Sequence, residues 1–266
     1  SLDRGPKPMR TVLVIAFLVL FVGAGTLLGL RQFAPQLLTG GAPAEEVDPG
    51  PVLPPPPVLS AEEAAALGVG IVAGVEGAIA ALDSLRVAAG LPESPPEDWL
   101  GGRYLAQAST FPQIEDFFQR SYDGYRSAES VLLARFRADA LNAMTEAGLT
   151  ASDAESVLDD SGRWLIPLEM DLSEIGIGMM EGPSAALDLH SYLVEVEDRI
   201  RYDPFDQPGV PADPVVEAIP LDEEVRAGFW DRIGTVAESF QATEDLVLAL
   251  PGKGQAVSDS VQGAGG

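Results

Sequence analysis

Two long apolar stretches dominate the first third of the chain. The first, TVLVIAFLVLFVGAGTLLGL over residues 11–30, holds thirteen Leu, Ile, Val or Phe side chains and no charge. A helix of about twenty residues spans the roughly 30 Å hydrocarbon core of a bilayer, and each of these side chains favours insertion by about 0.3–0.6 kcal/mol. The pattern therefore predicts a single transmembrane helix over residues 11–30.

The charges that flank this segment predict its orientation. Arg4, Lys7 and Arg10 precede it, and Arg31 is the only base between it and Arg86. Because cytoplasmic flanks are rich in Lys and Arg, we expect residues 1–10 in the cytoplasm and the rest of the chain in the periplasm, anchored in a bacterial inner membrane. A cleavable signal peptide is the alternative, but the apolar run is longer than is usual for one. An uncleaved anchor is favoured.

The second apolar stretch, residues 64–82, contains one acid and several glycines. Burying Glu76 in a bilayer costs about 3 kcal/mol, which is about what the seven aliphatic side chains of the stretch return. We therefore expect a tightly packed helix of the extramembrane domain, with a second membrane span as the alternative. Glycines let another backbone approach closely, so Gly70 and Gly74 are expected to be helix-packing positions.

Proline separates the two stretches. Residues 31–59 contain Pro35, Pro43, Pro49 and Pro51 and then the run Pro54–Pro57. Consecutive prolines prevent helix and central strand and favour polyproline II, which extends by about 3.1 Å per residue. This segment is predicted to be an extended linker that holds the following domain away from the membrane.

The remaining pattern predicts a mainly α domain of five or six helices over residues 60–250, joined by long irregular loops. Capping residues and apolar positions at helical spacing mark helices at about 60–89, 110–118, 123–147, 150–158, 184–201 and 222–250. Residues 163–180 are ambiguous, and Trp164–Pro167 is interpreted as a possible short strand. The five prolines of residues 202–220 predict an irregular loop. Pro251 and Gly252 predict the end of the last helix and a flexible tail over residues 251–266.

The net charge of the chain limits the kinds of molecule that it can bind. The chain has 16 Lys and Arg against 41 Asp and Glu, and its first 31 residues hold four of these bases and one acid. Residues 32–266 therefore hold twelve bases and forty acids, a net charge of −28. Such a surface repels nucleic acid and anionic lipid headgroups and suits partners with basic faces. The absence of cysteine excludes disulfides, thiolate metal sites and cysteine nucleophiles.

Candidate catalytic residues have simpler structural interpretations. His190 is the only histidine, and Ser184 follows a Gly-Pro pair in a sequence that lacks the final glycine of a nucleophile elbow, so Ser184 is better explained as a helix cap. The glycines of residues 68–74 have one residue too many for a dinucleotide-binding loop. None of the acid clusters has EF-hand spacing, although the loop acids Asp203, Asp206 and Asp213 are a candidate Ca²⁺ site. No catalytic site, cofactor or small-molecule substrate is expected.

Gly25 and Gly29 form a GxxxG pair inside the predicted membrane helix, which favours packing against another transmembrane helix. Together with the linker and the acidic domain, this indicates a non-catalytic accessory subunit of a larger bacterial membrane complex. Its expected partners are other membrane-protein subunits. A membrane-anchored sensor that binds a small ligand or cation is the alternative, and an anchored hydrolase is a weaker one.

Overall fold

The computed structural model describes residues 58–96, 99–202 and 218–265, which form a mainly helical protein. The predicted membrane helix with Gly25 and Gly29, the linker up to residue 57 and the acids Asp203, Asp206 and Asp213 all lie outside these residues. The elements are α3 (Ala61–Ala88), α4 (Gly102–Ala106), η1 (Ala108–Thr110), α5 (Pro112–Gly124), α6 (Ala128–Glu146), α7 (Ala151–Asp160), α8 (Gly162–Glu195), η2 (Glu197–Arg199), β1 (Ile200–Tyr202), β2 (Ala218–Pro220) and α9 (Glu223–Ala264).

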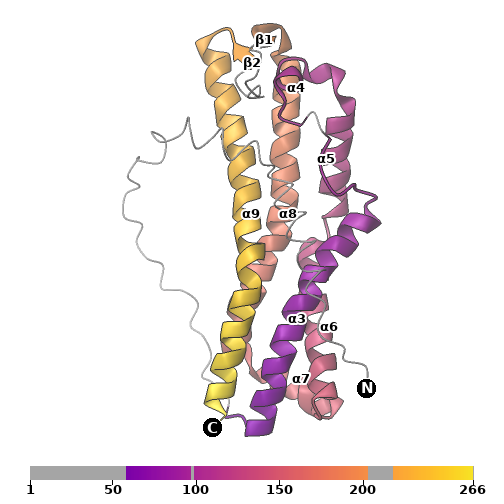
Figure 1. Ribbon diagram of the computed structural model, residues 1–266, viewed down its shortest axis with the longest axis vertical. Helices are drawn as coiled ribbons and strands as arrows, with labels where there is room; N and C mark the ends of the chain where they lie inside the picture. Colours follow the sequence, from indigo (N-terminus) through magenta and orange to yellow (C-terminus); the bar gives the residue numbers. More distant parts are fainter. Residues whose placement is uncertain (1–57, 97–98, 203–217, 266) are drawn as a thin grey trace, which may run out of the picture.

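Two helices, α8 and α9, run the length of an elongated bundle (Figure 1). At 34 and 42 residues they are about 50 and 60 Å long, since a helix rises 1.5 Å per residue. Helices α3, α6 and α7 complete the end of the bundle at which the chain terminates, and α4, α5 and the two short strands complete the opposite end. One continuous core runs through both ends.

Helix starts follow the predicted caps in three places. Ser60 Oγ accepts from the backbone N–H of Glu63 at 3.2 Å, and the Glu63 carboxylate accepts from the N–H of Ser60 at 2.8 Å, which confirms the capping box of α3. Thr150 caps α7 and Asp222 caps α9 in the same manner. The end of α3 is also as predicted, because Gly90 follows it with φ +64°.

Helix α8 corrects two predictions. Trp164–Pro167 is helical and not a strand, and Ser184 lies inside the helix and not at its N-cap. Both errors came from reading proline as a boundary, yet α8 contains Pro167 and Pro183. The buried side chains at Leu165, Leu168, Leu172, Ile175 and Met179 recur at helical spacing across this region, and their burial outweighs the cost of about 3 kcal/mol for an internal proline.

Helix α9 corrects a third prediction, the flexible tail over residues 251–266. The helix continues through Pro251 and Gly252 to Ala264. Beyond the proline, Gly254, Ser258 and Val261 are buried. Packing of this last part against α3 therefore overrides the local stop signal.

Two smaller boundaries also differ from the sequence pattern. The predicted helix at 123–147 is divided, because α5 ends at Gly124 and α6 begins at Ala128. Thr110 belongs to η1, and Phe111 occupies the N-cap position of α5. The edges of the predicted irregular loop at 202–220 pair as an antiparallel ribbon, β1 with β2, in which Arg201 lies opposite Ile219.

Candidate functional site

Helix α3 is the most unusual element of the described chain. It is the one helix in this part that is long and apolar enough to cross a membrane, and 67% of its most apolar eighteen-residue window is buried inside the protein. A core helix of a soluble domain meets the same criteria. The way α3 packs therefore decides how its sequence is interpreted.

On its inner side, α3 contacts α6 through glycines. A Cβ built on Gly70 would lie 2.6 Å from Cγ of Met144 and 3.0 Å from the carbonyl oxygen of Ala140. A Cβ on Gly74 would lie 2.7 Å from the carbonyl oxygen of Phe136. These distances are shorter than van der Waals contact, so at these two positions only glycine allows the observed approach of the two helices.

The contact between α3 and α9 is equally close. A Cβ on Gly68 would lie 2.6 Å from Nε2 of Gln262, and a Cβ on Gly254 would lie 2.9 Å from Cγ2 of Val75. The two helices run antiparallel, since Gly265 at the end of α9 lies beside Ala64 at the start of α3. Glycines on both helices therefore seat α3 between α6 and α9.

Charged side chains on the surface of α3 gather at its two ends, where Glu62, Glu63, Asp83 and Arg86 are partly or fully exposed. Between Ala64 and Leu82 the partly or fully exposed positions form one stripe, Ala65, Val69, Val72, Ala73, Glu76 and Ala80, here named the α3 stripe. Val69 is 51% exposed, and Glu76 is the single charged member. By contrast, the exposed face of α8 mixes Met170 and Ile177 with Arg163, Glu174 and Glu181. A surface helix normally turns charged side chains to water, so α3 is apolar on a side where its own fold does not bury it.

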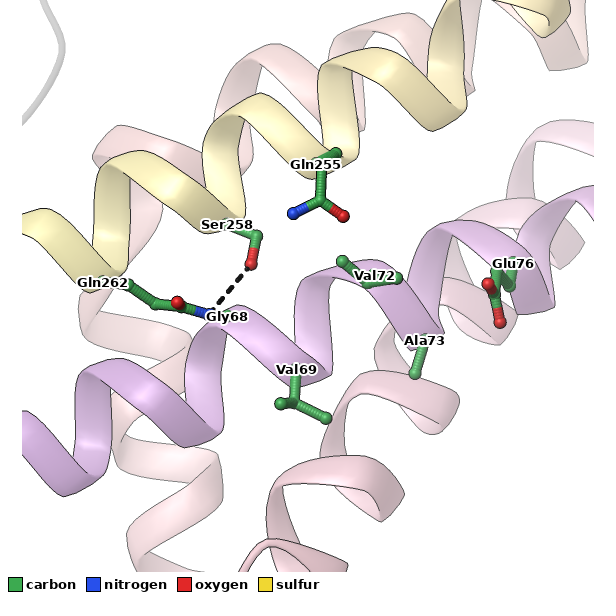
Figure 2. A pocket seen from close by; sticks show the side chains of 8 residues that line it. All are labelled: Gly68, Val69, Val72, Ala73, Glu76, Gln255, Ser258 and Gln262. Carbon is green, nitrogen blue, oxygen red and sulfur yellow. Dashed lines mark hydrogen bonds between the residues drawn. The ribbon is translucent and has the colours of Figure 1, made fainter. Parts of the chain in front are cut away.

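A groove of about 380 Å³ runs beside this stripe, between α3 and α9. Figure 2 shows Val72 between the two helices, with Gln255 and Ser258 on the α9 side. Nε2 of Gln262 donates a long hydrogen bond of 3.4 Å to Ser258 Oγ. Glu76 is the only charged residue that lines the groove. The groove thus offers an apolar floor, neutral polar groups on one wall and one carboxylate at one end.

A second polar constellation lies at the opposite end of the bundle. The buried His190 of α8 has Nδ1 3.2 Å from the Tyr104 hydroxyl and Nε2 3.6 Å from Oε2 of Glu115. If the tyrosine donates to Nδ1, the imidazole is neutral and carries its proton on Nε2, facing the carboxylate. Burial lowers the pKa of His190, and the negative charge of Glu115 partly offsets this.

This histidine cluster has the properties of a structural element. Tyr104 stacks on the imidazole with its ring centroid 5.9 Å away, and burial, with the Glu115 charge, raises the pKa of the Tyr104 hydroxyl. Ser184, the nucleophile candidate, is exposed on α8. It lies six residues before His190, so the two side chains leave the helix about 120° apart. The structure does not bring these two candidates together.

Three buried polar atoms have no hydrogen-bond partner among the described residues: the Tyr125 hydroxyl, Oε2 of Glu244, and Nε of Arg232, which still lies 3.0 Å from the Asp188 carboxylate as an ion pair. Glu244 lies on α9 and is 5% exposed. Burial, and secondarily the charge of Asp245, raises the pKa of its carboxyl group. The burial of Glu244 has no signal in the sequence, because Glu244 next to Asp245 resembles an ordinary exposed acidic pair.

Within residues 58–96, 99–202 and 218–265, no group of three or more histidine, aspartate or glutamate side chains is placed to hold a metal ion. The glycines of residues 68–74, which resembled a dinucleotide loop in sequence, lie within α3 and face its helix neighbours. The groove was not predicted. Its signal is present in the sequence as outward apolar positions three and four residues apart, but the inward and outward sides of an apolar helix cannot be assigned without its neighbours.

Comparison of the chain with models of protein families, with curated proteins and with solved structures finds no match.

Proposed function

We propose that this protein is a non-catalytic accessory subunit of a bacterial inner-membrane complex. A transmembrane helix over residues 11–30 anchors it, residues 31–59 form a spacer, and the helical bundle contacts other subunits from the periplasmic side. The observation that carries the proposal is the α3 stripe, an exposed apolar helix face beside a groove. Such a face is costly to leave in water and is typical of surfaces that bind another protein.

In this function the protein acts by holding a binding surface in a fixed position, without chemical catalysis. The anchor and spacer restrict the bundle to a layer next to the membrane, which raises its effective concentration toward neighbouring subunits. The close packing of α3 against α6 and α9 through glycines presents the stripe on a rigid body. A rigid surface loses little conformational entropy on association, which favours a stable contact.

Purification from native membranes tests the proposal. The tagged full chain is solubilised in mild detergent, and the purified material is sized and its subunits are identified by mass spectrometry. We expect a complex of fixed stoichiometry, with residues 31–59 protected from added protease. Recovery of the protein as a lone monomer, with those residues cleaved rapidly, would contradict the proposal.

The binding-module alternative has one supporting observation, because a groove of about 380 Å³ falls within the range of small-ligand pockets. A thermal-shift screen with divalent cations and metabolites distinguishes the two functions. A saturable rise in melting temperature that is abolished by Val72→Glu favours a ligand site. An unchanged melting temperature across the screen favours the accessory subunit.

A further inference from the structure

The outer half of α3 has an unexplained composition. Its inner side requires glycine at Gly70 and Gly74, but nothing in the described fold requires valine at Val69 or Val72, which are partly exposed. A helix that is apolar on all sides is normally a buried helix. This composition therefore indicates that another molecule or segment covers the α3 stripe.

We infer that the α3 stripe and its groove dock a basic helix of another subunit. That helix presents small apolar side chains to Val69 and Val72 and a Lys or Arg to Glu76. The inference rests on the proposed function and specifies the surface and the chemistry of the partner.

The negative charge of the described residues, and of Glu76 in particular, favours a basic helix as the molecule that binds the stripe. The described residues hold 31 Asp and Glu against 12 Lys and Arg, a net charge of −19. Within the described part of the chain, Glu76 makes no ion pair or hydrogen bond, and the α9 wall beside it contributes only Gln255, Ser258 and Gln262. A partner that covers the groove removes this carboxylate from water, which is unfavourable unless the partner supplies a positive charge.

The same argument weighs against two other occupants. A second copy of the chain brings another strongly acidic surface, and like charges oppose that association. Residues 11–30 of the same chain are apolar enough to lie on the stripe, but they carry no charge and would leave Glu76 unpaired. A helix from a different, basic subunit satisfies both the apolar and the charged part of the surface.

The geometry favours a helix as the docking element. The stripe extends over sixteen residues from Ala65 to Ala80, about 22 Å along the axis of α3. The groove lies between two antiparallel helices, and a third helix packs its ridge of side chains into such a groove. Glu76 lies one helical turn beyond Val72, so the partner's base is expected about one turn beyond its own central apolar residue.

Two synthetic peptides test the surface directly. The full chain is reconstituted in phosphatidylcholine nanodiscs and titrated into labelled twenty-residue helical peptides that share an Ala/Leu face. One peptide carries Lys at its flanking positions, and the other carries Glu. Fluorescence anisotropy is measured at two salt concentrations, with empty nanodiscs as the blank. We expect saturable binding of the Lys peptide and at least tenfold weaker binding of the Glu peptide.

A matched pair of variants separates docking from general attraction. Val69→Glu and Ile177→Glu each add one negative charge at an exposed apolar position, the first on the stripe and the second on α8. Docking on the stripe predicts at least tenfold weaker Lys-peptide binding for Val69→Glu and less than twofold change for Ile177→Glu. If the attraction were only electrostatic, both variants would bind the peptide more tightly, and the inference would be wrong. Ala73→Glu serves as a second stripe variant should Val69→Glu fail to fold.

Glu76→Gln tests the charged contact. This variant is expected to weaken Lys-peptide binding severalfold and to reduce its salt dependence, whereas unchanged affinity and salt dependence would remove Glu76 from the proposed contact.

Crosslinking in native membranes tests which molecule covers the stripe. Because the chain has no cysteine, Val69→Cys and the control Ile177→Cys each create a unique attachment point for a photocrosslinker. The inference expects a Val69→Cys crosslink to a Lys- or Arg-bearing helix of a different subunit. A crosslink to a second copy, or to residues 11–30, overturns it. If the complex purifies intact from the Val69→Glu strain, the docking surface is wrong while the accessory function stands. If the wild-type chain purifies alone, the accessory function itself fails.

Discussion

The two ends of the bundle are held together by opposite kinds of side chain. At the end formed by α3, α6 and the last part of α9, glycines remove side chains so that helices meet closely, as at Gly74 against Phe136. At the other end, rings fill the space between helices. Phe118 lies 4.4 Å from the Trp99 ring and 6.3 Å from the Phe240 ring, measured between centroids. We call these the glycine end and the aromatic end.

This contrast separates the features of the sequence that the fold itself explains from those that it does not. At the aromatic end, Tyr104, Phe117 and Phe118 are buried, and Trp99 and Phe240 are partly buried against the same core, so packing accounts for these rings. At the glycine end, packing accounts for the glycines of α3 but not for the valines on its outer side. The groove lies beside these valines at the glycine end, which is why the proposed docking surface is placed there.

The largest expected effect is at the aromatic end. Phe118→Ala removes a fully buried ring from among Trp99, Phe117 and Phe240 and leaves a cavity. Replacing a buried Phe by Ala costs about 3–5 kcal/mol. We expect a loss of that size in the free energy of unfolding, measured by urea denaturation of the full chain in detergent. Tryptophan fluorescence reports the bundle alone, because Trp99, Trp164 and Trp230 all lie in it and none lies in residues 11–30.

The glycine end responds to the opposite change, the addition of an atom. Gly74→Ala places a methyl group 2.7 Å from the backbone oxygen of Phe136, and a backbone atom cannot rotate away. Overpacking of this kind costs about 1–3 kcal/mol, which exceeds the gain of about 1 kcal/mol from alanine in a helix. From the middle of that range we expect a net loss of about 1 kcal/mol by the same measurement. A gain in stability would show that the two helices do not meet as closely as described and would remove the contrast between the two ends.

The sequence-based predictions were correct where the signal is local and wrong where the outcome depends on residues far away in the sequence. Caps such as Ser60 and Asp222 act within three residues, and the starts of the helices that they cap were predicted correctly. Pro167, Pro183 and Pro251 were misinterpreted because their cost is local, whereas the burial that offsets it depends on distant residues such as Val75. The groove was missed for the same reason, because it too depends on residues that are distant in the sequence. It depends on which side of α3 faces α6 and α9, and an apolar pattern on all sides does not specify that.

Glu244 lies on α9 between the two ends, and its buried carboxyl group is expected to make the stability of the bundle depend on pH. Burial, with the charge of Asp245, raises the pKa of its carboxyl group above the ordinary value near 4.5, so the folded protein holds this proton more tightly than the unfolded chain does. The stability that this proton provides is present at low pH and is lost as pH rises from about 4.5 through the raised pKa. Glu244→Gln is therefore expected to raise the free energy of unfolding at pH 8 by about 1 kcal/mol, through removal of an unpaired buried charge.

Urea denaturation at pH 4 and pH 8 measures this difference. The variant should gain little at pH 4, where the wild-type carboxyl group is already protonated. Glu238→Gln, at an exposed position of the same helix, is the matched control and should change stability equally little at both pH values. An equal gain at both pH values for Glu244→Gln would mean that ionisation of Glu244 has no part in the effect.

The smallest effect comes from a glycine that packs against nothing. A Cβ on Gly234 of α9 would meet no atom within 4 Å, so alanine there adds helix propensity without a clash. We expect Gly234→Ala to raise the free energy of unfolding by about 0.5–1 kcal/mol, opposite in sign to Gly74→Ala. Measured side by side, these two substitutions share the same chemistry and differ only in surroundings. If both stabilise the protein, glycine in this chain merely weakens its helices; if they differ in sign, the glycines of α3 are there to bring helices together.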